Sequence, residues 1–218
     1  MSTAILDYLD ENGGHLTNGH YVFTTGKHST EYFNIRAVAH KAAWMYSIGG
    51  RLATVIRGLE PEILIGPETL GRTFVSYTAP WLDDVEAIWC DIVGEGSERK
   101  AVFNPKLDFG RLVEGRRVAV IDDLVTSGSS LKLTSDLVTD HGGIVVVGAA
   151  VVSRNELVGA AECGVPVLGV LENFKGERSY TPQECKDFGP CSLLTPLNGR
   201  PGHGHEFILE NPDYPVAV

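Results

Sequence analysis

One segment of the chain carries residues that could bind a phosphorylated ligand. In RVAVIDDLVTSGSSL (Arg117–Leu131), an apolar strand ends in two adjacent acids, and a short loop of hydroxyl residues and glycine opens a helix. Ligands bind at the carboxyl ends of parallel strands, and the backbone N–H groups of a helix N-terminus favour an anion. The loop TSGSS (126–130) therefore suits a phosphate monoester. The acid pair, Asp122 and Asp123, suits a ribose diol or a magnesium ion reached directly or through water.

The same residues also have an ordinary structural interpretation. The hydroxyl groups would then cap the helix, and the two acids would merely end a strand. Each feature is common when taken alone. A strand, an acid pair, a hydroxyl-glycine loop and a helix in this order favour ligand binding.

The rest of the chain predicts the sheet that would position this segment. Short apolar runs predict strands, and apolar residues at helical spacing predict helices between them. The expected strands are Glu62–Gly66, Val85–Cys90, Arg117–Ile121, Ile144–Val152 and Val167–Leu171, and the expected helices are Ala37–Leu59, Thr69–Ala79, Ser129–His141 and Asn155–Cys163. This alternation is typical of an α/β fold in which helices flank a parallel sheet.

Two regions depart from the alternation. Residues Ser97–Arg111 are polar and irregular, which predicts a mobile loop. After Phe174 the composition changes, because residues 175–218 hold six of the eleven prolines and show little apolar periodicity. We therefore expect one domain over residues 1–174 and an irregular C-terminal extension over residues 175–218.

Charge and composition exclude several classes of protein. The 218 residues include 18 Lys and Arg and 28 Asp and Glu, which gives a net charge of −10. Binding to nucleic acid or to an anionic membrane needs a basic surface, so neither is expected as a partner. No apolar stretch reaches about 18 residues, and the acidic N-terminus does not resemble a signal peptide. We expect a cytoplasmic protein whose four cysteines are reduced thiols.

The extension also holds residues that could bind a metal. Cys185, Cys191, His203 and His205 could form a zinc site in principle. Cys-x5-Cys with His-x-His is not a standard zinc spacing, however. The sequence therefore favours reduced cysteines and loop histidines over a metal site.

The segment VAVIDDLVTSGSSL (118–131) resembles the phosphoribosyl pyrophosphate (PRPP) signature of the type I phosphoribosyltransferases. Three further segments give the chain an order of motifs most similar to that of the orotate phosphoribosyltransferases. They are YVFTTGKHSTEYFNIR (21–36), ILIGPETLGRT (63–73) and VVSRNE (151–156). The resemblance covers roughly residues 15–172.

This resemblance implies both a fold and a reaction. The fold would be a parallel sheet flanked by helices, with a small hood over the ligand. The reaction would move a phosphoribosyl group from PRPP to a nucleobase, with orotate as the expected base and orotidine monophosphate and pyrophosphate as products of pyrimidine biosynthesis. The resemblance further implies Mg²⁺ bound through PRPP near Asp122 and Asp123, and a homodimer whose mobile loop reaches the partner's site.

The resemblance also implies roles for individual residues. The ribose hydroxyls would be held by Asp122 and Asp123, and the phosphate of PRPP by Thr126, Ser127, Gly128, Ser129 and Ser130. Pyrophosphate would meet the backbone of Thr69 and Gly71, with Lys27, Arg99 and Lys100 as cations. The base would lie against Phe33 and Asn34, and its carboxylate would pair with Arg154. Lys27 could equally be a solvated turn lysine, and Arg154 could be a helix-start arginine that faces water.

Two segments depart from the family pattern. The loop GEGSERKAVFNPKLDFG (94–110) lacks the Lys-Asp-His-Gly core of the orotate enzymes, although Lys106 and Asp108 could substitute for it. Leu70 stands where many of these enzymes have a lysine. Both changes remove cations from the place where pyrophosphate departs. Two alternatives therefore stay open, namely a transferase for another base and a PRPP-binding regulatory protein without turnover.

Overall fold

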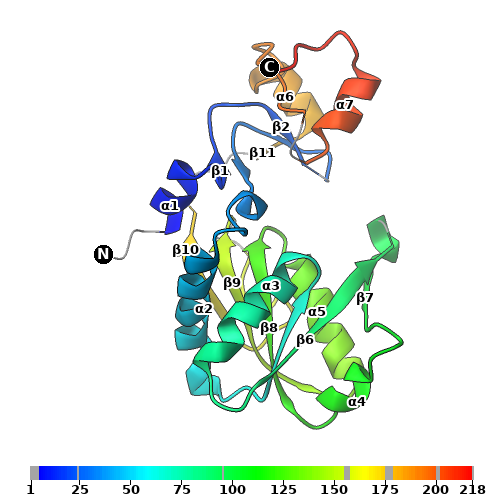
Figure 1. The fold of residues 1–218 in the computed structure, drawn as a ribbon. Helices are drawn as coiled ribbons and strands as arrows, with labels where there is room; N and C mark the ends of the chain where they lie inside the picture. The colour runs from blue at the N-terminus through cyan, green and yellow to red at the C-terminus, as the bar shows by residue number, and fades with distance from the viewer. Residues whose placement is uncertain are drawn as a thin grey trace. The chain divides into compact units, whose positions relative to one another are not determined.

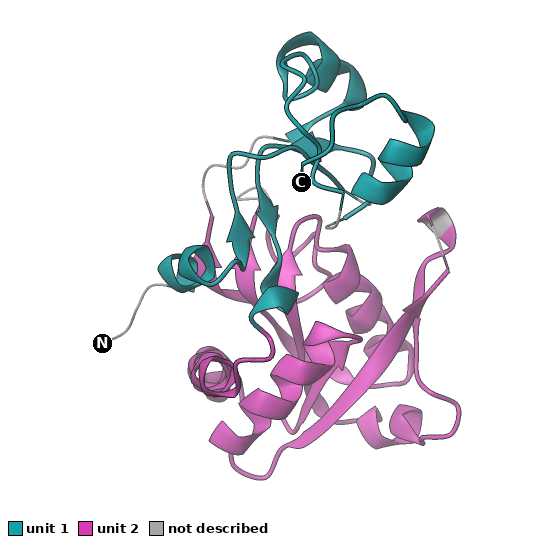
Figure 2. Ribbon diagram, turned by 45° about the horizontal axis from the view of Figure 1, so that its top comes forward, with its two compact units in different colours: residues 1–38, 176–218 teal, residues 39–175 magenta. Residues whose placement is uncertain are grey.

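The structure of the chain, a computed structural model, describes residues 5–23, 25–94, 96–154, 158–174, 179–199 and 202–217 (Figure 1). The chain divides into two compact units (Figure 2). Unit 1 combines residues 1–38 with residues 176–218, and unit 2 is the continuous stretch 39–175. No helix in the described part of the chain is long and apolar enough to cross a membrane.

A six-stranded sheet forms the centre of unit 2, in the order β10-β9-β8-β5-β6-β7. Its strands are β5 (Ile63–Pro67), β6 (Glu86–Val93), β7 (Lys100–Val102), β8 (Arg117–Val125), β9 (Ile144–Ser153) and β10 (Leu168–Asn173). Neighbouring strands run parallel except at the β6–β7 edge. The predicted α/β fold with a parallel sheet is confirmed.

Helices cover both faces of this sheet, which explains why β5 and β9 are almost entirely apolar. The helices are α2 (Ala42–Ile56), α3 (Leu70–Thr78), α4 (Phe109–Val113) and α5 (Ser129–Asp140), and the 3-10 turns are η2 (Arg57–Leu59), η3 (Ala79–Trp81) and η4 (Gly96–Glu98). Helices α2 and α3 pack together, and α3 lies on β5, β6 and β8 (Figure 1). The right-handed β5–α3–β6 and β8–α5–β9 crossovers run in opposite directions across the sheet and so place α3 and α5 on opposite faces.

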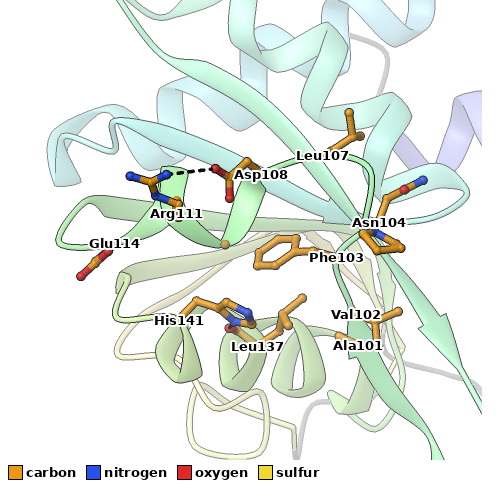
Figure 3. A pocket seen from close by; sticks show the side chains of 12 residues that line it. Ala101, Val102, Phe103, Asn104, Leu107, Asp108, Arg111, Glu114, Leu137 and His141 are labelled. Carbon is orange, nitrogen blue, oxygen red and sulfur yellow. Dashed lines mark hydrogen bonds and ion pairs between the residues drawn. The ribbon is translucent and has the colours of Figure 1, made fainter.

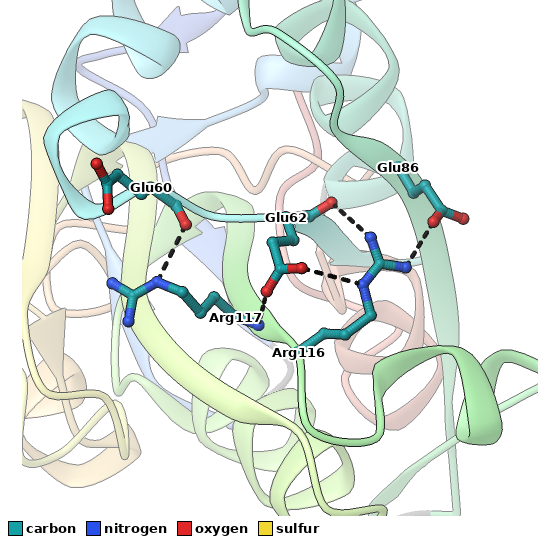
Figure 4. Close-up of polar contacts among 5 residues, drawn as sticks. All are labelled: Glu60, Glu62, Glu86, Arg116 and Arg117. Carbon is teal, nitrogen blue, oxygen red and sulfur yellow. Dashed lines mark hydrogen bonds and ion pairs between the residues drawn. The ribbon is translucent and has the colours of Figure 1, made fainter.

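Ion pairs and hydrogen bonds close the amino end of the sheet (Figure 4). The Arg116 guanidinium lies 3.5 Å from Glu62 and 2.5 Å from Glu86. The backbone N–H of Arg117 donates to the Glu62 carboxylate at 2.9 Å, and this bond lowers the pKa of Glu62. The Arg117 side chain donates to the backbone oxygens of Leu59 and Glu60. Both arginines are therefore occupied by protein groups at this end of the sheet.

Unit 1 is built from short elements at the two ends of the chain. They are α1 (Ile5–Glu11), β1 (His15–Leu16), β2 (Tyr21–Val22), β3 (His28–Ser29), β4 (Tyr32–Phe33), η1 (Ile35–Ala37), β11 (Ser179–Tyr180), α6 (Pro182–Phe188) and α7 (Gly204–Glu210). Strand β1 pairs with β4, and β3 lies between β2 and β11 in a three-stranded sheet. The bridge between His20 and Leu197 further joins the two ends of the chain.

Several predicted elements differ from the structure. The helix predicted over Asn155–Cys163 is wrong in its described part, residues 158–163, which form a turn closed by the Glu162 carboxylate accepting from the Gly159 N–H at 2.8 Å. Residues 155–157 lie outside the described residues. The helix predicted from Ala37 begins only at Ala42, because residues 35–37 form η1.

Two segments predicted to be irregular contain regular structure. The segment predicted as a mobile loop contains β7 and the start of α4, because β7 satisfies the outer backbone groups of β6. The expected irregular extension contains β11, α6 and α7 in its described part, and it groups with residues 1–38 in unit 1.

Candidate functional site

The strand order of unit 2 reverses between β5 and β8, which are neighbours in the sheet. Strand β5 leads through α3 to β6 on one side, and β8 leads through α5 to β9 on the other. Such a switch point opens a crevice at the carboxyl ends of the two strands. The predicted pyrophosphate loop follows β5 and the predicted phosphate loop follows β8, so the fold brings both loops to the crevice.

The acid pair lies on β8 near the end of this strand. Asp122 is 7% exposed and lies opposite Ala150 of β9, whereas Asp123 is half-buried. The backbone N–H of Asp123 donates to the Asp122 carboxylate at 2.9 Å. Burial raises the pKa of Asp122 well above its usual range, and the charge of Asp123 raises it further. The pair therefore resists carrying two negative charges, and hydroxyl donors or a cation bound beside it would relieve that cost.

The predicted phosphate loop forms a tight turn before α5. Gly128 has a φ of 78° and is the N-cap residue, so it offers the first helical turn no side-chain acceptor. The hydroxyl of Ser127 donates to that of Ser129 at 3.1 Å, and both residues are exposed together with Thr126. Ser130 is half-buried in the first turn. Exposed hydroxyls and helix N–H groups are a suitable set of donors for a phosphate.

The loop after β5 brings Thr69 and Gly71 to the same crevice. Thr69 is exposed and follows a cis peptide bond at Glu68, and Gly71 is buried at the start of α3. A Cβ atom on Gly71 would lie 2.8 Å from the Ile121 backbone oxygen and 2.6 Å from Pro67. The visible role of Gly71 is thus to let α3 approach the sheet, which positions Thr69.

Sequence reasoning missed one cation beside this loop. The Arg72 guanidinium lies 3.9 Å above the ring of Trp89 and 2.8 Å from the Glu68 carboxylate. The arginine in the segment ILIGPETLGRT (63–73) could have indicated this cation from the sequence. Arg72 places positive charge next to the loop in which Leu70 replaces the lysine of many orotate enzymes.

Arg154 follows β9 at the same edge of the sheet. Its backbone N–H donates to the Val125 oxygen at 2.9 Å, and Val125 lies opposite Ser153. The residue is half-buried. The structure therefore brings the backbone of Arg154 next to the end of the strand that carries the acid pair.

Arg99 and Lys100 are not brought to the acid pair within one chain. Both are exposed, and Lys100 lies on the edge strand β7 opposite Val93. Three strand spacings separate β7 from β8 in the sheet order, which corresponds to roughly 14 Å. These cations lie toward the carboxyl end of the sheet but at its far edge.

Three further predicted site residues belong to unit 1. Lys27 is exposed in the turn between β2 and β3, where its oxygen accepts from the Phe23 N–H at 2.8 Å. Phe33 is 4% exposed, and its ring stacks on that of His15 with centroids 4.3 Å apart. The N–H of Asn34 donates to the Gly14 oxygen at 2.8 Å. Their contacts with a base or pyrophosphate stay predictions.

Unit 2 also contains a pocket of about 680 Å³, and Figure 3 shows the side chains that line it. It is lined by Phe103, Leu137 and His141 and bordered by the Asp108–Arg111 ion pair. Leu137 and His141 lie at the end of α5, and the phosphate loop lies at its beginning. The 12 residues of α5 span roughly 18 Å, so the pocket is not part of the candidate site.

The four residues considered as zinc ligands do not come together as a group. Cys185 and Cys191 lie close to each other in unit 1, but His203 and His205 are exposed. The structure groups the two cysteines with His20 and His28 instead.

The fold and this site define a class of protein. The chain is similar to the crystal structure of orotate phosphoribosyltransferase from Aeropyrum pernix, with a TM-score of 0.61 and 21% identity over 84% of this chain and 97% of that one. The fold is that of the type I phosphoribosyltransferases, as the PRPP-like segment on β8 and α5 led us to expect.

Sequence comparison defines the family within this class. The chain is 30% identical to orotate phosphoribosyltransferase from Heliobacterium modesticaldum over 184 residues, which are 83% of this chain and 89% of that protein. It is 27% identical to the Thermotoga maritima protein of the same name over 176 residues, or 80% and 87% of the two chains. No family model matches the chain. The chain belongs to the orotate phosphoribosyltransferase family.

Proposed function

We propose that this chain transfers the phosphoribosyl group of PRPP to orotate and releases pyrophosphate, which forms orotidine monophosphate for pyrimidine biosynthesis. The observation that carries the proposal is the switch point between β5 and β8, where a buried acid pair precedes an exposed hydroxyl loop at a helix N-terminus. The family to which the chain belongs supports the same reaction.

In this reaction the bond between C1 of the ribose and the pyrophosphate oxygen breaks as a nitrogen of the base attacks C1. The ribose gains positive charge, and negative charge grows on the pyrophosphate. Asp122 and Asp123 would accept hydrogen bonds from the ribose hydroxyls and hold the ring, and residues 126–130 would hold the phosphate. Fixing both ends of the sugar keeps C1 in place for attack. Arg154 would pair with the carboxylate of orotate through two parallel hydrogen bonds.

Mg²⁺ bound through PRPP would fit this donor set. Asp122 and Asp123 are adjacent on β8, and a nearby positive charge would offset the burial and the like charge that raise the pKa of Asp122. Carboxylate and phosphate oxygens are the ligands that Mg²⁺ prefers. When bound, the ion would neutralise charge on the departing pyrophosphate.

We also propose that the enzyme acts as a cytoplasmic homodimer. Lys100 lies three strands from the acid pair in its own chain, so a second copy would have to supply Arg99 and Lys100 to complete the crevice. Lys27 would be a further cation for the pyrophosphate. Four free cysteines support a reducing compartment. Neither nucleic acid nor a membrane is proposed as a partner.

The proposal is tested with the full chain, PRPP, Mg²⁺ and orotate, following the loss of orotate absorbance. Arg154→Ala should lower kcat/KM for orotate about 10- to 150-fold, because a charge-assisted hydrogen-bonded pair contributes about 1.5–3 kcal/mol. PRPP affinity should be retained. Arg111→Ala, which removes an exposed arginine on α4, is the matched control and should leave turnover unchanged.

Calorimetric titration with PRPP tests the acid pair separately. Replacing both acids, Asp122→Asn with Asp123→Asn, should weaken PRPP binding at least tenfold. The matched control is Asp136→Asn with Asp140→Asn, which removes the same charge from exposed positions of α5. Unchanged PRPP affinity in the Asp122/Asp123 variant would refute the site. Tight PRPP binding without turnover on any base would identify a regulatory protein instead of an enzyme.

A further inference from the structure

Four buried side chains in unit 1 bring four potential metal ligands to one point. They are His20, His28, Cys185 and Cys191, which are 0%, 2%, 0% and 9% exposed. One ligand atom from each residue lies within 4.8 Å of the other three. Both cysteines are free thiols. Among the described residues, none of the groups that form the crevice of unit 2 belongs to this cluster.

We propose that this cluster is a structural zinc site. A tetrahedral Zn²⁺ with Zn–S bonds of about 2.3 Å and Zn–N bonds of about 2.0 Å separates neighbouring S and N ligand atoms by about 3.5 Å. The Sγ atoms of Cys185 and Cys191 lie 3.8 and 3.7 Å from His20 Nε2. Cys191 Sγ lies 3.5 Å from His28 Nδ1. Three sulfur–nitrogen distances thus already match a tetrahedral ion.

The two ring nitrogens lie somewhat closer than a metal requires. His20 Nε2 and His28 Nδ1 are 2.7 Å apart, and a tetrahedral Zn²⁺ would hold two nitrogens about 3.3 Å apart. A separation of this pair by about half an ångström is therefore enough to admit the ion. Two cysteines and two histidines form the set of sulfur and nitrogen ligands that favours zinc over hard cations.

Hydrogen bonds outside the cluster orient its ligands. His20 Nδ1 lies 3.3 Å from the Thr195 backbone oxygen and 3.0 Å from the Tyr214 hydroxyl. A carbonyl oxygen only accepts, so Nδ1 of His20 carries the proton and Nε2 directs its lone pair at the cluster. The backbone N–H of Cys191 donates to Cys185 Sγ at 3.1 Å, which holds this sulfur in place within the cluster.

Aromatic rings shield the cluster from water. The ring of Phe207 packs edge-on against His28 at 5.1 Å between centroids, and the ring of Tyr214 packs against His20 at 5.3 Å. Four protein ligands in a buried setting leave no position for a substrate, so the site fits a structural role. His28 also lines a pocket of about 640 Å³ in unit 1, so the cluster lies beside this pocket.

Local sequence features explain why α6 presents Cys185 at this point. Thr181 and Glu184 form a capping box, in which the Thr181 side chain accepts from the Glu184 N–H and the Glu184 carboxylate accepts from the Thr181 N–H. Pro182 at the first turn fixes where the helix begins. Gly189 then lets the chain turn closely past Cys185, because a Cβ atom at this glycine would lie 2.7 Å from Cys185 Cα.

The ion would join the two ends of the chain in unit 1. Cys185 and Cys191 follow His20 by 165 and 171 residues. The strands of unit 1 have two residues each, so their hydrogen bonds alone are a weak support. A metal cross-link is a common device by which small units of this kind are stabilised.

Metal content of the full chain tests the proposal independently of phosphoribosyl transfer. Protein purified under reducing conditions should contain one zinc ion per chain by plasma mass spectrometry. Cys185→Ser with Cys191→Ser should lose the ion, and His203→Ala with His205→Ala, which replaces exposed histidines of the same unit, should retain it. Zinc retained by the cysteine variant would overturn the site. So would a Cys185–Cys191 disulfide, or a reduced wild-type chain that binds neither Zn²⁺ nor Co²⁺.

A second variant covers the case in which the cysteine variant fails to fold. His28→Cys keeps four ligands and adds a third thiolate. The Co²⁺-loaded variant should show tetrahedral visible bands and a thiolate-to-metal charge-transfer band about 1.5 times as intense as in the wild type, in proportion to the number of thiolates. An unchanged spectrum would show that residue 28 is not a ligand. Removal of zinc with a chelator should speed hydrogen exchange in β2, β3 and α6 but not in β8 and β9, and equal effects in both units would contradict a site confined to unit 1.

Discussion

At the residue scale, Gly128 is the position where the predicted phosphate loop depends most on having no side chain. Its φ of 78° lies in the left-handed region. A Cβ atom there would also lie 2.9 Å from Cys163 Sγ and 3.0 Å from the Glu162 backbone oxygen. The backbone oxygen cannot move aside as a flexible side chain could. The turn into α5 is therefore held in shape by contacts from the neighbouring segment.

Gly128→Ala should lower the free energy of unfolding by about 2–3 kcal/mol, because left-handed strain and overpacking add. It should also weaken PRPP binding at least tenfold, since the loop must shift. Gly115→Ala is the matched control, with a φ of 71° and no atom within 4 Å of its Cβ, and it should cost only about 1 kcal/mol. Urea unfolding and calorimetric titration measure the two effects. Equal unfolding costs would show that the neighbouring segment does not constrain the loop.

The sequence alone predicted the strand and the helix that flank the acid pair and the predicted phosphate loop, because these features follow one another along the chain. Strand, acids, glycine turn and helix follow one another within Arg117–Leu131, and β8 and α5 occupy those positions. The histidines of the metal cluster could not be found in this way. His20 and His28 meet the cysteines only because the two ends of the chain pack together. The spacing of these residues along the sequence does not indicate that packing.

At the scale of elements, the close approach of α3 to the sheet determines the crevice. A Cβ atom on Gly66 would meet the backbone of Gly71, and one on Gly71 would lie 2.8 Å from the Ile121 oxygen. Two glycines at this crossing thus bring the start of α3 against the ends of β5 and β8. The loop that carries Thr69 depends on this contact for its position.

Gly71→Ala should lower the free energy of unfolding by about 1–3 kcal/mol, because the added methyl group meets backbone that cannot give way. It should also raise the KM for PRPP, since Thr69 would move with α3. Gly58→Ala in η2 is the control, because no atom lies within 4 Å of its Cβ, and its stability should change by less than about 1 kcal/mol. Thermal unfolding and steady-state kinetics provide the readouts. An unchanged KM for PRPP in Gly71→Ala would show that the position of Thr69 does not affect PRPP binding.

Strands that are buried on both faces of the sheet could be predicted from the sequence. Elements that form only because they pair with another segment could not. Strands β5 and β9 are apolar runs, and β8 contains the apolar run Val118–Ile121 before its acid pair, so these buried segments can be read from the sequence. Strand β7 has only three residues, Lys100–Val102, and it becomes a strand because it pairs with the edge of β6. The helix predicted after β9 is reduced in its described part to a turn that ends at Gly164, whose φ is 63° and after which the Val165 N–H donates to the Ala160 oxygen at 3.0 Å.

At the scale of the whole molecule, unit 2 contains its own hydrophobic core. The core cluster that includes Ile65, Val120 and Val138 lies entirely within residues 39–175. The same stretch carries the whole six-stranded sheet, the acid pair and the phosphate loop. The six-stranded sheet, the acid pair and the predicted phosphate loop are therefore encoded in one continuous part of the chain.

A fragment of residues 39–175 should fold by itself and unfold cooperatively in urea, because it keeps this core. Dispersed amide resonances and a single unfolding transition would be the expected observations. The Val120→Ala variant of the fragment removes fully buried methyl groups. It should lose about 1–3 kcal/mol of its free energy of unfolding and therefore unfold at a lower urea concentration. A fragment that unfolds without a cooperative transition would show that the sheet needs residues of unit 1.

Unit 1 takes β2 and β3 from one end of the chain and α6 from the other, which has a consequence for synthesis in the cell. Cys191 follows His28 by 163 residues, so at roughly 5–20 residues per second a ribosome needs on the order of ten to thirty seconds to add it. During that interval the nascent amino-terminal segment lacks β11, which later pairs with the edge of β3. The continuous unit 2 emerges in between. The order of translation therefore favours folding of the large unit first and makes closure of the small unit the last step.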